Sequence, residues 1–183
     1  MAKKNDWMFT PANQALFNRR LIRIDAVDVP AIELFSGQET FGASPALIKR
    51  QSSYNDMFDR FLLRKVEREI PSLNLTAHEL TEETRSSDLV EMYLPGLGFG
   101  SEVFLAHVWY LLTLQPAGEE GVLLTSGRGN AFHVGVPGTG IVAVGVRWND
   151  GWNVEADSRI DAVNHQAVRW YAGCRVFSRQ RAV

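Results

Sequence analysis

The chain has 183 residues, of which 45% are hydrophobic and 22% charged, and its formal net charge at pH 7 is −2. This length and composition are typical of one globular domain and exclude a disordered or fibrous protein. A pI of about 6.1 excludes the overall basic character of a dedicated nucleic-acid binder. Charge is uneven along the chain, however, because residues 51–100 are acidic and residues 121–183 are basic.

Cys174 is the only cysteine, which excludes an intrachain disulfide and a cysteine metal cluster. The lysines near the N-terminus are not followed by the apolar run of a secretory leader. The longest apolar run, residues 108–112, is far shorter than the roughly 20 residues of a membrane span. We therefore expect a cytoplasmic protein with no membrane partner.

The first half of the chain predicts helices with a few strands between them. Thr10 followed by Pro11 is typical of a helix start. A strand is expected over residues 21–27 and a loop over 37–45. Apolar residues at helical spacing predict a helix over 53–70, and a capping box formed by Thr76 and Glu79 predicts a second, short one over 76–83. A strand over 89–94 and a glycine loop over 95–100 follow.

The second half predicts one buried helix and then a series of strands. Residues 102–114 are apolar around most of a helical circumference, which indicates a buried helix. Glycine and proline then separate short apolar segments, which is typical of strands joined by turns. These strands are expected over residues 122–125, 131–136, 141–148, 152–157 and 175–179.

The hairpin over residues 141–157 is the most specific structural prediction. Only a three-residue loop of Asn149, Asp150 and Gly151, with Gly151 left-handed, sets Trp148 directly opposite Trp152 and keeps all the apolar residues on one face. The other face, which carries Asn153, Glu155 and Asp157, is expected to be wet.

Taken together, the elements predict an α+β fold in which an antiparallel C-terminal sheet packs against two or three helices. Residues 1–183 are expected to form one domain. Within it, residues 1–45 form an N-terminal arm or flank, 53–115 are mainly helical and 121–180 are mainly antiparallel strands.

Several patterns in the sequence are candidate sites for chemistry. A glycine loop before a helix could bind an anion through Gly96, Gly98, Gly100 and Ser101, although its spacing is not that of a dinucleotide fingerprint and a tight turn explains it better. The four histidines, His78, His107, His133 and His165, have no metal-ligand spacing. An inert, buried Cys174 is favoured over a nucleophile. The sequence thus predicts no catalytic residue, no metal and no cofactor.

Aromatic residues and arginines gather in the C-terminal part of the chain. Tryptophan, tyrosine and arginine are common in contact surfaces. Because Trp148 and Trp152 fit a core face, the better candidates for a surface are Arg169, Trp170, Tyr171, Arg175 and Arg179. A protein partner or self-association is expected through them.

The segment 170–179, with residues 118–125 before it, resembles uncharacterised small bacterial proteins, and the resemblance covers about a third of the chain. It implies a bacterial origin and a recurrent β-rich unit but supplies no activity. The sequence therefore favours a non-enzymatic binding or assembly protein. The alternatives are a small hydrolase or transferase with a histidine-centred site and a glycine-loop anion site, and a single-stranded nucleic-acid binder that uses the basic C-terminal segment.

Overall fold

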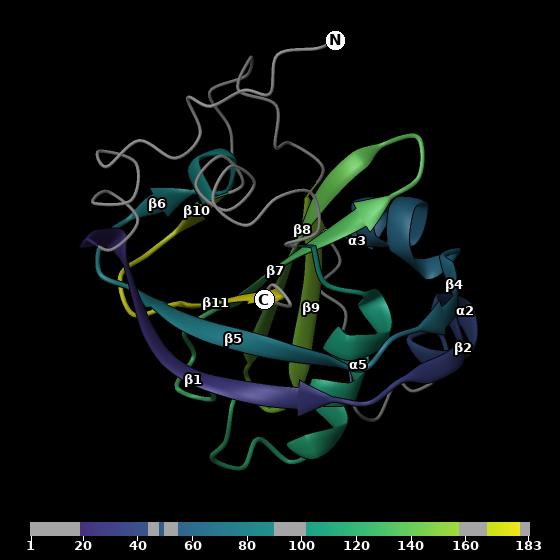
Figure 1. Ribbon diagram of the computed structural model, residues 1–183, viewed down its shortest axis with the longest axis horizontal. Helices are drawn as coiled ribbons and strands as arrows, with labels where there is room; N and C mark the ends of the chain where they lie inside the picture. Colours follow the sequence, from purple (N-terminus) through teal and green to yellow (C-terminus); the bar gives the residue numbers. More distant parts are fainter. Residues whose placement is uncertain (1–18, 44–47, 50–54, 90–101, 158–167, 180–183) are drawn as a thin grey trace, which may run out of the picture.

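A seven-stranded mixed sheet forms the centre of the computed structural model (Figure 1). The structure describes residues 19–43, 48–49, 55–89, 102–157 and 168–179. In spatial order the strands of the sheet are β1 (Leu21–Val29), β5 (Leu73–Leu80), β11 (Arg175–Arg179), β7 (Asn130–Val136), β8 (Gly140–Trp148), β9 (Trp152–Asp157) and β3 (Ile48–Lys49).

Two short ribbons and a few helices complete the described part of the chain. One ribbon pairs β2 (Ile32–Ser36) with β4 (Val66–Ile70), and the other pairs β6 (Thr84–Arg85) with β10 (Arg169–Trp170). The helices are α2 (Gly37–Thr40), α3 (Asn55–Phe58), the π-helix η2 (Asp59–Leu63) and α5 (Leu105–Leu114). Residues 86–89 are also helical.

The predicted fold class is wrong, because the molecule is dominated by a mixed sheet. Three of the sheet's strands, β1, β3 and β5, come from the first half of the chain, and β1 comes from within the segment expected to be an arm or flank. The pairing of β11 with β7 and that of β9 with β3 are parallel. The C-terminal strands are therefore not a separate antiparallel sheet packed on a helical half.

Two predicted helices are largely absent because pairing between strands overrides local helical preference. In the segment 53–70, helical structure ends at Leu63, and the chain continues as β4, which pairs with β2. The segment 76–83 lies mostly in β5, an interior strand held between β1 and β11. The helix expected over 102–114 is confirmed as α5.

The predicted strand over residues 122–125 is instead a loop whose backbone is held by side chains. The amide of Gln115 pairs with both the N–H and the carbonyl of Leu123, at 2.8 and 3.1 Å. The amide of Asn130 does the same for Leu124, also at 2.8 and 3.1 Å. These amides take the place of a neighbouring strand. Of the strand expected over 89–94, Leu89 is helical and the rest lies outside the described residues.

The hairpin of β8 and β9 confirms the predicted register. Trp148 lies directly opposite Trp152, and their rings meet edge to face with centroids 5.1 Å apart. The left-handed position of the three-residue loop is Asp150, with φ of 51°, while Gly151 has φ of 139°. The face expected to be wet is partly buried, because Asn153 is only 6% exposed and Glu155 is half-buried.

The main core lies between the sheet and α5. Buried α5 side chains pack with buried sheet residues in one cluster, which includes Val108, Leu111, Leu112, Phe132, Val144, Trp152 and Phe177. The N-terminus of α5 is held by Glu67 of β4, whose carboxylate accepts the N–H groups of Leu105 at 3.0 Å and Ala106 at 2.9 Å. An acid at this end suits the helix dipole. Lys65 pairs with the same carboxylate.

Strand β1 forms one edge of the sheet and is interrupted by a bulge. The register with β5 shifts between Arg23 and Asp25, so Ile24 is an extra residue. The Asp25 carboxylate accepts the N–H of Ala26 at 2.7 Å. Ile22, before the bulge, and Ile24, within it, are 54% and 39% exposed. None of the helices in the described ranges is long and apolar enough to cross a membrane.

Candidate binding surface

The ribbon of β6 and β10 continues the pairing of β5 with β11. An irregular segment interrupts both strands between the two pairings. Leu80 exchanges backbone hydrogen bonds with the turn before β11, donating to the carbonyl of Cys174 at 2.9 Å and accepting from Gly173 at 2.7 Å. Thr84 then lies opposite Trp170, and Arg85 lies opposite Arg169. Figure 1 shows β6 and β10 beside each other, past the ends of β5 and β11. The ribbon is thus one end of a long antiparallel ladder.

Trp170 anchors the ribbon to the sheet and is not a surface residue, so its predicted exposure is wrong. Its side chain is 2% exposed, and its indole N–H donates to the Ser86 hydroxyl at 2.7 Å. The ring lies over Gly129 and Gly145, where an added Cβ would meet ring atoms at 3.1 and 3.0 Å. Because both positions are glycine, the indole can pack directly on the backbone.

Around Trp170 lies a second, smaller core cluster on the face of the sheet opposite α5. It contains Leu21, Leu80, Leu89, Ala131, Trp170, Cys174 and Val176. The buried state of Cys174, which is 5% exposed, agrees with the structural role expected for it.

The outward side of the ribbon carries four side chains, which we name the ribbon face: Glu83, Arg85, Arg169 and Tyr171. Arg85 and Arg169 are both exposed and lie directly opposite each other. A guanidinium nitrogen of Arg169 lies 2.6 Å from a carboxylate oxygen of Glu83. Tyr171 is 59% exposed, the largest value among the large hydrophobic side chains of the described residues. The ribbon face therefore combines an aromatic side chain with two arginines and one acid.

Tyr171 is presented by a turn that is fixed from three sides. The Cys174 N–H donates to the Tyr171 carbonyl at 3.1 Å, and Gly173 is tied to Leu80 as described above. The guanidinium of Arg128 donates to the Ala172 carbonyl. Gly173 has φ of 79°, and a Cβ there would lie 2.2 Å from the Arg128 side chain. The turn requires glycine at this position.

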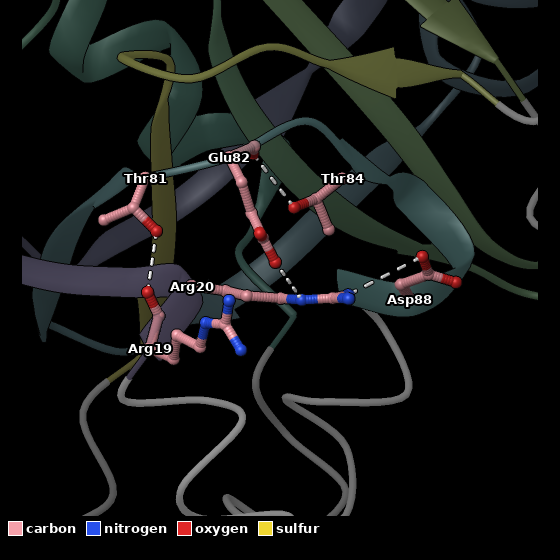
Figure 2. A network of polar contacts seen from close by, with 6 residues as sticks. All are labelled: Arg19, Arg20, Thr81, Glu82, Thr84 and Asp88. Atoms are coloured by element: carbon pink, nitrogen blue, oxygen red, sulfur yellow. Dashed lines mark hydrogen bonds and ion pairs between the residues drawn. The ribbon is translucent and has the colours of Figure 1, made fainter.

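A network of polar contacts joins the residues just before β1 to the segments on either side of β6 (Figure 2). The Arg20 guanidinium lies 2.5 Å from Glu82 and 3.9 Å from Asp88. The Thr81 hydroxyl donates to the Arg19 carbonyl at 2.7 Å, and the Thr84 hydroxyl donates to the Glu82 carbonyl at 3.2 Å. The segments on either side of β6 are therefore held by the residues just before β1, and their acidic groups lie beside Arg20.

The other two predicted surface arginines are engaged elsewhere. Arg175 donates to the backbone carbonyls of Gly121 and Val122 in the loop held by Gln115. The guanidinium of Arg179 lies 5.9 Å from the centre of the Phe104 ring. The structure thus brings together Arg169 and Tyr171 and adds Glu83 and Arg85, which the sequence analysis missed. A strand of two residues leaves no periodic signal that could have revealed them.

The histidines inside the described residues are all buried. Burial lowers the pKa of His133 to about 4. Burial, followed by the charge of Arg23, lowers the pKa of His78 to about 4. Burial also lowers the pKa of His107, whose Nε2 lies 3.3 Å from the Pro30 carbonyl. Each is therefore neutral at pH 7.

Neither a metal site nor the candidate anion loop is found among the described residues. In the described part of the chain, no group of three or more histidine, cysteine, aspartate or glutamate side chains could hold a metal ion. The proposed anion loop, Gly96, Gly98, Gly100 and Ser101, and His165 lie outside the described residues. No protein-family model, curated protein or solved structure matches this chain.

Proposed function

We propose that this chain is a non-enzymatic binding or assembly protein that contacts its partner through the ribbon face. The supporting observation is the position of Tyr171, which is 59% exposed on a turn fixed by three backbone contacts, beside two exposed arginines. Tyrosine and arginine dominate the energetic centres of protein interfaces. A tyrosine can supply a large contact area while losing little conformational entropy.

The anchoring of the ribbon favours the same proposal. Trp170 packs under the ribbon, and its indole is hydrogen bonded to Ser86, so the outward side chains start from a fixed backbone. A preorganised surface loses less entropy on binding than a loose one, which leaves more of the contact energy for affinity.

The test compares two exposed hydrophobic residues on different ribbons. Tyr171→Ala removes the aromatic ring of the ribbon face, and the matched control Leu34→Ala removes a side chain that is 52% exposed on β2. The partner is first purified from the source cell by its affinity for immobilised wild-type chain. Each protein is then analysed by size-exclusion chromatography with light scattering, alone and mixed with this partner. The wild type and the control are expected to exceed the 20.5 kDa of one chain.

Tyr171→Ala is expected to run as a single chain with an unchanged melting temperature. The proposal is overturned if the wild type stays monomeric and retains no partner, or if Tyr171→Ala assembles as well as the control does.

A further inference from the structure

The two arginines of the ribbon face lie next to each other in a way that does not favour folding. Arg85 and Arg169 are direct cross-strand neighbours, and like charges in this position destabilise a strand pair. Glu83 lies beside Arg169 and compensates its charge. Among the described residues, Arg85 has no carboxylate within ion-pair distance. The pair therefore carries uncompensated positive charge on an exposed surface.

We propose that the ribbon face binds an acidic segment of a partner protein, with a carboxylate of that segment held between Arg85 and Arg169. This inference rests on the proposed function and names the chemistry of the partner. A guanidinium has five N–H donors in a planar fork, so Arg169 can keep Glu83 on one edge and offer another edge to a ligand. Carboxylates fit such forks with two hydrogen bonds. Tyr171 then provides an apolar contact next to the ion pair.

The charges around the ribbon face favour a peptide over a nucleic acid. Glu83 lies within the face, and Glu82, the residue before it in the chain, lies with Asp88 beside Arg20 in the network of Figure 2. A phosphate backbone carries a charge at every nucleotide close to these acids, whereas a peptide can place one carboxylate between the two arginines and extend its other side chains away from the surface. The pI of about 6.1 also gives the chain little general attraction for phosphate polymers.

The experiment measures the fluorescence anisotropy of a fluorescein-labelled hexaglutamate peptide in low salt. Saturable binding to the wild type is expected. Arg85→Gln and Arg169→Gln are each expected to weaken it about tenfold, since each removes a charge-assisted pair. The control Arg68→Gln removes an exposed arginine on β4 and is expected to leave the affinity unchanged.

Thermal melting gives a second readout that separates binding from a structural role. Arg85→Gln relieves the cross-strand repulsion, so its melting temperature is expected to equal or exceed that of the wild type. Arg85→Glu introduces a charge that can pair with Arg169, and it is expected to raise the melting temperature while abolishing peptide binding. A lower melting temperature for both variants would show that Arg85 serves the fold and would overturn the inference.

Two further outcomes overturn the inference. One is the absence of saturable hexaglutamate binding. The other is tighter, Arg85-dependent binding of an unlabelled oligothymidylate, which would assign the arginines to a phosphate ligand. In either case, loss of assembly in Tyr171→Ala with normal assembly in Leu34→Ala would still support the proposed binding function, so the two failures can be told apart.

Discussion

The two faces of the central sheet are buried by different kinds of side chains. On the face that packs against α5, the core is a continuous cluster of aliphatic and aromatic residues. On the opposite face, a small apolar cluster surrounds Trp170, and a band of buried polar side chains continues across the sheet. This band consists of Thr76, His78, His133, Asn153 and Ser178.

The two faces of the sheet therefore have different roles. The α5 face buries apolar surface, which is the main source of folding free energy. The opposite face anchors the ribbon through Trp170 and contains two of the buried histidines. We therefore expect global stability to depend most on the first face, and acid sensitivity and the order of the ribbon to depend on the second.

The largest effect is expected from Trp152→Ala on the α5 face. Trp152 is fully buried, and its indole N–H donates to the Gln115 carbonyl at 2.8 Å. The substitution leaves a cavity and unpairs that carbonyl, so a loss of about 4 kcal/mol is expected. Chemical denaturation measures it. A loss under about 1 kcal/mol would show that this core is not the main source of stability.

Trp170→Ala is expected to lower the global free energy of unfolding by less, about 3 kcal/mol at most. The reason is that the ribbon can open while the sheet stays folded. Hydrogen exchange should show faster exchange at the Ser86 amide, which donates to the Val168 carbonyl at 2.9 Å, than in β7 or β8. Equal acceleration throughout the sheet would contradict this separation of the ribbon from the main core.

Acid should destabilise the protein through the polar face. The pKa of His133 is about 4 in the folded state against 6.5 for an ordinary histidine. Between these values the unfolded chain takes up a proton that the folded chain does not, so stability is intact above pH 6.5 and falls as the pH decreases toward 4. The loss is about 2 kcal/mol at pH 5. His78 is expected to contribute similarly.

His133→Gln should therefore lose less stability than the wild type between pH 7 and pH 5, as measured by urea unfolding at both values. Identical pH dependence in the two proteins would show that His133 is not a source of the acid effect.

The smallest of these effects is expected at the N-terminus of α5. Glu67→Gln replaces a carboxylate that accepts two helix N–H groups with an amide that has one acceptor oxygen, which should cost about 1 kcal/mol. Urea unfolding at pH 7 measures the loss. Glu69→Gln, at an exposed position of the same strand, is the control and should have no effect.

Local patterns predicted the parts of the fold that form from neighbouring residues. The hairpin of Trp148 and Trp152 was predicted with the correct register because its turn and its alternation lie within a single segment of the sequence. The apolar circumference of α5 also predicted a buried helix. In both cases the residues that determine the structure are close in sequence.

Such patterns could not predict contacts between residues that are far apart in the sequence. Thr76 and Glu79 resemble a helix start, but β1 and β11 hold them in a strand. Trp170 looked like a surface residue, and its burial depends on Gly129 and Gly145 beneath the ring. The pairing of Arg85 with Arg169 is equally non-local, which is why only part of the candidate surface could be predicted.

The bulge in β1 has a consequence for how the protein behaves in concentrated solution. An unpaired edge strand with exposed isoleucines can template the growth of fibrils from identical molecules. Here the extra residue Ile24 twists the edge strand, and the Asp25 carboxylate accepts the hydrogen bond of the Ala26 N–H. A second molecule therefore cannot extend the hydrogen-bond ladder past this point. This edge strand thereby discourages fibril formation, while its isoleucines remain in contact with water.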